Sequence, residues 1–133
     1  MWTWLTRGEK RPPEAELKGA PAHPRKKTYS AETGYVYQYL YKGFRIATSG
    51  VQFVFEATQG RAEFQITVLL TNTALAECET VVGREILHQE HYAIVKMAIF
   101  AAFNRVADPS AFHWELAPDQ DAILAHLKTL DRI

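Results

Sequence analysis

The sequence predicts an α+β domain in which an antiparallel sheet packs against one long helix. Apolar and polar residues alternate with a period of two from residue 34 to about residue 71, as in a half-buried strand. From Asn72 onward the apolar residues recur at helical spacing instead. A chain of 133 residues with 47% hydrophobic and 23% charged residues is typical of one globular domain. This composition excludes a fully disordered chain, a disulfide scaffold and a membrane bundle.

Four runs of alternating residues, at 35–42, 44–47, 51–56 and 62–70, predict the strands of an antiparallel meander. Short turns that contain glycine separate these runs. The second run is short, and it merges with the first if the chain forms a bulge at Gly43. We therefore expect a sheet of three or four strands.

Two helices are expected to follow, separated by Gly83. Asn72 or Thr73 caps a short helix that runs through Thr80. The pattern from 84 to 106 is the longest helical stretch, and it contains no glycine or proline. Its apolar stripe is so wide that the sheet covers one side and another element must cover a second side. The stripe consists of Leu87, His91, Ile94, Val95, Ala98 and Ala102, and Met97, Ile99, Phe100 and Phe103 widen it.

A last helix, from Pro118 to about Arg132, is the predicted cover for that second side. Pro118 suits the first position of a helix, and Asp119 and Asp121 favour its positive N-terminal end. Its apolar residues make a single stripe, formed by Ile123, Leu124, Leu127 and Leu130. We expect Trp114, which precedes this helix, to fill the gap between the two helices.

Residues 1–28 are expected to form a basic, proline-rich tail, separate from an α+β domain at residues 29–133. The tail contains four of the six prolines and carries seven basic and three acidic residues, a net charge of plus four. The rest of the chain carries minus four, so the neutral total hides a dipolar chain. Because proline fixes φ and donates no hydrogen bond, we expect residues 6–24 to be poorly ordered or to adhere to the acidic domain. Contact with a polyanion is the alternative role for this charge.

Tyrosines at every second position of the first strand form a candidate binding stripe. Such residues stabilise a sheet through cross-strand pairs, and they are also enriched at protein interfaces. On an open sheet beside basic groups, aromatic rings also stack single-stranded bases. That third interpretation requires the stripe to face solvent on the same side as the basic tail. The candidate binding residues are Tyr35, Tyr37, Tyr39 and Tyr41 with Arg25, Lys26 and Lys27.

Glu85, His88 and His91 stand at positions i, i+3 and i+6 of the predicted long helix, and they are the candidate metal ligands. Two histidines three residues apart bind a metal firmly only with further ligands from another element. The candidates for those ligands are His113, Glu115 and His126. The alternative is a polar first turn, in which Glu85 and Glu90 favour the positive end of the helix.

Two other reactive side chains have structural explanations. Cys78 stands between Glu77 and Glu79, whose charges raise the pKa of a thiol, so a catalytic thiol is not expected. Lys96 is the only charge within residues 92–103, and it either reaches water past its neighbours or loses basicity by burial. The glycine-rich motifs that cradle phosphates are absent, and no cofactor is expected.

These observations favour a small cytoplasmic protein, of a kind common in bacteria, that acts as a non-enzymatic protein-interaction module and self-associates. One alternative is a single-stranded nucleic-acid binder that uses the tail and the tyrosine stripe. The other is a metal-binding protein or enzyme built on Glu85, His88 and His91. The first apolar run stops at Arg7, and no run reaches the roughly 20 residues that span a bilayer, so neither export nor a membrane partner is expected.

Overall fold

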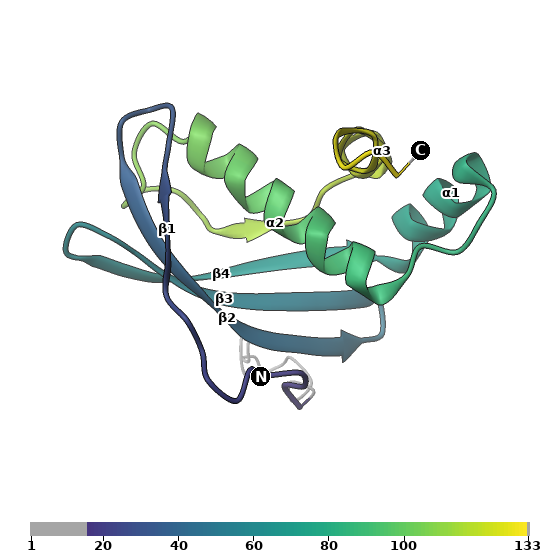
Figure 1. Cartoon of the computed structure of the whole chain (residues 1–133), viewed down its shortest axis with the longest axis horizontal. Helices are drawn as coiled ribbons and strands as arrows, with labels where there is room; N and C mark the ends of the chain where they lie inside the picture. Colours follow the sequence, from purple (N-terminus) through teal and green to yellow (C-terminus); the bar gives the residue numbers. More distant parts are fainter. Residues whose placement is uncertain (1–15, 133) are drawn as a thin grey trace, which may run out of the picture.

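The computed structural model describes residues 16–132, which form a five-stranded sheet with helices above it (Figure 1). Three long strands make the predicted antiparallel meander: β2 (Val36–Ala47), β3 (Gly50–Gln59) and β4 (Ala62–Thr71). Two short strands extend it, namely β1 (Lys27–Ser30) beside β2 and β5 (Glu115–Leu116) beside β4, so the sheet has five strands and not the expected three or four. The order across the sheet is therefore β1-β2-β3-β4-β5.

A bulge at Gly43 joins the first two sequence runs into the single strand β2. The register between β2 and β3 shifts between Tyr41 and Gly43, and Gly43 has a φ of 128°. A Cβ atom at Gly43 would collide with the carbonyl oxygen of Lys18. Lys18 lies so close because its backbone exchanges two hydrogen bonds with Phe44, of 2.7 and 2.9 Å. The bulge thus accommodates the N-terminal segment at the edge of β2.

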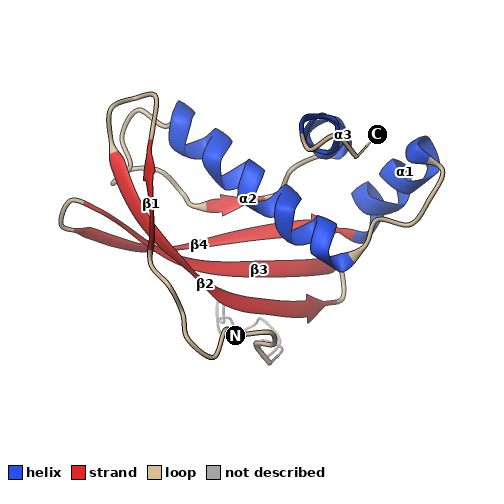
Figure 2. Cartoon of the chain, in the orientation of Figure 1, coloured by secondary structure: helices blue, strands red, loops and turns tan. Residues whose placement is uncertain are grey.

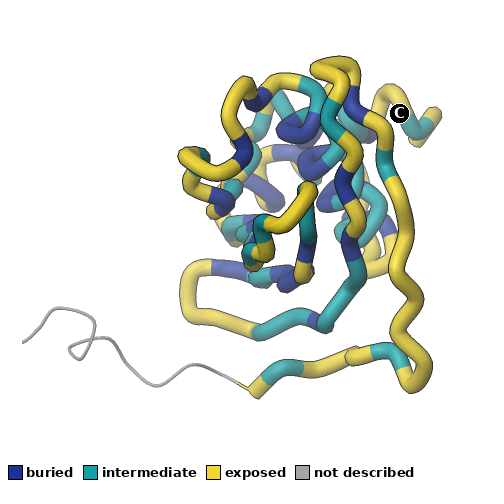
Figure 3. The backbone as a smooth tube through the Cα atoms, turned by 90° about the vertical axis from the view of Figure 1, so that its left-hand side faces the viewer, coloured by how far each residue is buried: buried dark blue, intermediate teal, exposed yellow. Residues whose placement is uncertain are grey.

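The N-terminal segment is more closely attached to the domain than the predicted tail. β1 begins at Lys27, inside that tail, and places Tyr29 opposite Tyr37. Four residues carry too short an alternation to be recognised as a strand, because their order comes from pairing with β2. Residues 22–28 lie fully exposed along the molecule (Figure 3). Of the segment expected to be irregular, residues 6–15 lie outside the described residues.

β5 corrects the expectation of a purely antiparallel sheet. Its two residues pair in parallel with Thr67 and Val68 of β4, and the Thr67 N–H donates to the carbonyl of Trp114 at 3.0 Å. A parallel neighbour needs a long crossover, which the two helices after β4 supply. A strand of two residues leaves no periodic pattern in the sequence.

Three helices lie on the same side of the sheet (Figure 2): α1 (Asn72–Val82), α2 (His88–Arg105) and α3 (Gln120–Thr129). α1 begins after Thr71, whose hydroxyl accepts the N–H of Ala74 at 3.1 Å, and it ends at Gly83 with a φ of 80°. The glycine stop was predicted correctly, while the cap is Thr71 and neither Asn72 nor Thr73, the two predicted candidates. No helix among residues 16–132 is long and apolar enough to cross a membrane.

Both later helices begin further along the chain than predicted. Residues 84–87 form a connection instead of the first turn of α2, because the Ile86 N–H donates to the carboxylate of Glu79 at 2.8 Å. Leu87 is consequently the extended cap residue and is 46% exposed, outside the core stripe. At α3 the carboxylate of Asp119 accepts the N–H of Ala122 at 2.9 Å, so Asp119 is the cap and Pro118 precedes the helix.

The core between α2 and the sheet is strongly aromatic. Tyr37 is fully buried and stacks on Phe103 of α2 with ring centroids 3.9 Å apart. Trp114 is not the filler between two helices that was expected. It stacks on Phe64 of β4 at 4.9 Å and meets Phe103 at 5.6 Å, so it closes the end of the core between α2 and the sheet. Its indole N–H donates to the carbonyl of Pro109 at 3.0 Å.

Candidate functional site

One row of α2, with a residue at every fourth position, runs along the edge of the sheet formed by β1 and β2. Residues four apart lie above one another on one helix face. The row consists of His88, Tyr92, Lys96, Phe100 and Asn104. Four of its five members make aromatic or hydrogen-bonded contacts with the strands below, and the remaining member is a lysine.

The contacts of the row are regular on both sides of the lysine. His88 lies over Phe44 at a centroid distance of 4.6 Å, and Tyr92 meets Tyr41 edge-on at 5.0 Å. Beyond Lys96, Phe100 stacks on Tyr29 of β1 at 4.4 Å. The side-chain amide of Asn104 then donates to the hydroxyl of Tyr29 at 2.8 Å and accepts the N–H of Glu32 at 3.0 Å.

Lys96 is enclosed by three aromatic rings. Its Nζ atom lies 5.6 Å from the ring of Tyr39, 5.4 Å from Tyr92 and 5.7 Å from Phe100. Burial lowers the pKa of Lys96, and the positive charge of nearby Lys27 lowers it further. The two lysines therefore face each other, and within the described chain neither has a carboxylate in ion-pair contact.

A hollow of about 180 Å³ opens beside this lysine pair. Aromatic rings of β2, β3 and α2 line it, and the exposed N-terminal segment forms its rim. No aspartate or glutamate from residues 16–132 lines it. We call the hollow together with the lysine pair the basic-aromatic groove. Its candidate functional residues are His23, Arg25, Lys27, Tyr39, Tyr41, Tyr92 and Lys96.

The groove brings together four of the seven binding residues expected from the sequence: Arg25, Lys27, Tyr39 and Tyr41. The other three lie elsewhere. Tyr37 is 0% exposed beneath α2, and Tyr35 lies against it with the rings 6.5 Å apart. Lys26 points to the opposite face of the sheet, because side chains alternate along an extended chain. α2 covers the tyrosine stripe, so it does not form the open platform that base stacking along it requires.

Sequence reasoning missed Tyr92 as a partner of these residues and treated Lys96 as an isolated charge. The spacing of four from His88 to Asn104 is visible in the sequence and marks one helix face. The sequence did not reveal β1, and β1 is the strand that brings Lys27 close to Lys96.

The candidate metal ligands do not share one helix face. Glu85 belongs to the connection before α2, so the helical spacing to His88 does not apply. The rings of His88 and His91 are 5.9 Å apart, and neither ring nitrogen of His91 has a hydrogen-bond partner among residues 16–132. Within that range no three side chains of His, Cys, Asp or Glu are grouped so that they could hold a metal ion. His113 instead pairs with Glu115 at 3.5 Å on the surface.

Cys78 is buried in α1, and its thiol donates to the carbonyl of Gln120 at 3.5 Å. Burial raises the thiol pKa, and the negative charges of Glu77 and Asp119 raise it further. A neutral thiol is a weak nucleophile, so this environment is structural.

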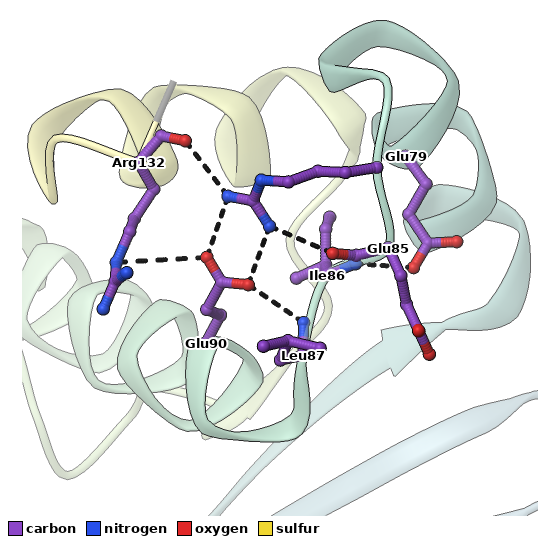
Figure 4. Close-up of polar contacts among 7 residues, drawn as sticks. Glu79, Glu85, Ile86, Leu87, Glu90 and Arg132 are labelled. Atoms are coloured by element: carbon purple, nitrogen blue, oxygen red, sulfur yellow. Dashed lines mark hydrogen bonds and ion pairs between the residues drawn. The ribbon is translucent and has the colours of Figure 1, made fainter.

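A second cluster of charges lies at the start of α2 (Figure 4). Glu90 is 4% exposed, and its two carboxylate oxygens each accept a hydrogen bond from Arg84 at 2.9 Å. The same carboxylate accepts the N–H of Leu87 at 3.0 Å, and Arg132 lies 3.9 Å away. The hydrogen bonds from Arg84 and Leu87 lower the pKa of Glu90. Two arginines thus compensate the carboxylate of Glu90, and Arg132 fastens the residues after α3 to the start of α2.

A larger hollow, of about 390 Å³, lies on the uncovered face of the sheet, lined by Gln38, Glu56 and Glu63 among others. Its charges are mixed, and Glu56 already pairs with Lys42 at 3.7 Å. The basic-aromatic groove is thus the site where unpaired charge and ring surface coincide. Comparison of the chain with protein-family models, with curated proteins and with solved structures gives no match.

Proposed function

We propose that this protein is a non-enzymatic binding module that holds an anionic macromolecule in the basic-aromatic groove. One observation carries the proposal: Lys27 and Lys96 face each other beside an aromatic hollow, with no carboxylate from the described chain to compensate them. Two facing ammonium groups repel each other, but an anion between them attracts both, so the net electrostatic interaction becomes favourable. Arg25 and His23 on the rim extend the same positive charge.

A purely structural role accounts for the groove less well. The three rings around Lys96 stabilise its ammonium group by a cation–π interaction of about 0.5–1 kcal/mol. These rings do not stabilise the ammonium group of Lys27. A leucine or methionine at position 96 would fill the same space in the row without removing a charged group from water. An anion satisfies both lysines at once.

The direct test is a calorimetric titration of the full chain with linear polyphosphate at low and moderate salt. We expect binding that weakens steeply with salt, because phosphate contacts release counterions. Replacing both lysines, Lys27→Gln with Lys96→Gln, should weaken binding at least tenfold and reduce the salt slope by about two. The matched control is Lys128→Gln, an exposed lysine of α3 outside the groove. Equal affinity for the double variant and the control would contradict the proposal.

A protein interface, including self-association, is the second candidate. It is favoured by the row of α2 next to the groove, where Ala93, Met97 and Ala101 are apolar and only half-buried. Surface apolar rows of this kind are used as contacts between subunits. Sedimentation at micromolar concentration should then show a dimer that Met97→Glu dissociates, whereas a monomer at all concentrations removes this candidate.

A further inference from the structure

We infer that the ligand of the groove is a single-stranded nucleic acid, with one base in the hollow against Tyr41 and Tyr92 and its phosphate between Lys27 and Lys96. This inference rests on the proposed function, which requires only an anionic macromolecule. The inference further requires that the ligand carries planar bases. The base would contact one ring from β2 and one from α2, and not the tyrosine stripe that α2 covers.

The size and lining of the hollow suit one base. Its volume of about 180 Å³ corresponds to about six water molecules, which is room for a single planar ring system. Tyr39, Tyr41, Phe55 and Tyr92 supply the lining rings. Aromatic side chains bind bases through their π-faces without regard to sequence, so we expect little preference among the bases.

The lysine pair lies where a nucleotide carries its charge. In a nucleotide every base has a phosphate beside it, and the Lys96 Nζ atom lies 5.4 Å from the ring centre of Tyr92. A base held against that ring therefore keeps its phosphate within reach of Lys96 and Lys27. The rim adds Arg25 and His23 along the extended, exposed residues 22–28, which provides a track for the next phosphates.

The same features disfavour two other anions. In a duplex the bases are stacked and paired, so none enters the hollow unless it is first unstacked at a cost. An acidic peptide supplies carboxylates but no ring at each charge, so it leaves the aromatic lining unused. A single strand matches both the charge and the rings.

The experiment compares four probes on the full chain: a twelve-nucleotide thymidine strand, an abasic strand of equal length, a duplex and polyglutamate. We expect the thymidine strand to bind about tenfold more tightly than the abasic strand, because base stacking is lost in the latter. Tyr92→Leu removes one lining ring and should reduce that ratio towards one. Tyr92→Phe keeps the ring and its packing on Tyr41, so it should keep the ratio.

The outcomes separate the inference from the proposed function. Equal binding of the thymidine and abasic strands, with polyphosphate still bound, overturns the inference and leaves the anion site standing. Polyglutamate or duplex binding as tight as that of the single strand also overturns it. Failure of every anion, polyphosphate included, overturns both. The ratio for the unmodified chain decides the matter even if Tyr92→Leu does not fold.

Discussion

Helix α2 carries two charged clusters that were built in opposite ways. At its first turn, Arg84 and Arg132 surround Glu90, so the charge of the buried carboxylate is compensated within the chain. Two turns further along, Lys96 faces Lys27 with rings around it and no described carboxylate in ion-pair contact. The same helix thus has one cluster in which the protein supplies the counter-charge and one for which we propose that a ligand supplies it.

This difference separates stability from binding. A buried carboxylate without its arginine is costly, so the first cluster is needed for the fold. Like charges repel, so the closeness of Lys27 and Lys96 does not favour the folded chain, and the rings around Lys96 offset only part of that repulsion. Variants that alter one cluster at a time, or the segment that supports the groove, test this difference. Their expected effects on the free energy of unfolding decrease from Arg84 to Lys96.

Arg84→Ala should have the largest effect on stability, a greater loss in the free energy of unfolding than any groove variant, because it removes two hydrogen bonds to the carboxylate of Glu90. It leaves the buried carboxylate of Glu90 with the N–H of Leu87 and with Arg132, which lies 3.9 Å away and is not in hydrogen-bond contact. Urea denaturation measures the loss, and Glu85→Ala at an exposed neighbouring position is the control. A loss below about 0.5 kcal/mol, within the range of ordinary surface changes, would contradict the structural role of this cluster.

Gly43→Ala should cost about 1–3 kcal/mol, because a side chain at a φ of 128° is strained. The new Cβ atom also collides with the carbonyl of Lys18 and so detaches the segment that carries Pro21 and His23, one wall of the groove. Polyphosphate affinity should fall together with stability, while Arg84→Ala should leave that affinity unchanged. If Gly43→Ala binds polyphosphate as the unmodified chain does, the segment is not part of the site.

Stability should fall as the pH is lowered from 7.5 to 5.5. Burial lowers the pKa of His91, and the charge of His88 lowers it further, whereas Glu79 and Glu90 oppose the shift. Burial lowers the pKa of His126 as well. Below the ordinary histidine pKa of 6.5, the unfolded chain binds more protons than the folded chain. The stability is therefore retained above that pH and lost below it. Urea midpoints should vary less with pH in His91→Phe, and an unchanged slope in the double variant with His126→Phe would refute the assignment.

Lys96→Met should have the smallest effect, a change in unfolding free energy within about 1 kcal/mol of zero. It removes the repulsion from Lys27 and keeps an apolar chain between the rings of Tyr39 and Tyr92. Thermal unfolding at low salt measures it. A loss as large as that of Arg84→Ala would mean that the two clusters do not differ.

The sequence predicted the meander and the number of helices because each depends on a local pattern of period two or 3.6, and it left the bulge at Gly43 as one of two alternatives. It did not predict β1 or β5, whose order comes from neighbours far along the chain. The start of α2 was wrong for a related reason: Glu79 captures the Ile86 N–H and keeps the connection out of the helix. Four groove residues were expected, but their meeting with Tyr92 and Lys96 depends on how α2 crosses β2, which no local pattern encodes.

The most direct test of the contrast between the clusters is the rise in melting temperature that saturating polyphosphate causes. A ligand that binds only the folded chain stabilises it by an amount that rises with the logarithm of its concentration divided by its Kd. We predict a rise for the unmodified chain, an equal rise for Arg84→Ala from its lower starting temperature, and less than half that rise for Lys27→Gln with Lys96→Gln. A full rise in the double lysine variant, or no rise in Arg84→Ala, would contradict the assignment of one cluster to folding and the other to binding.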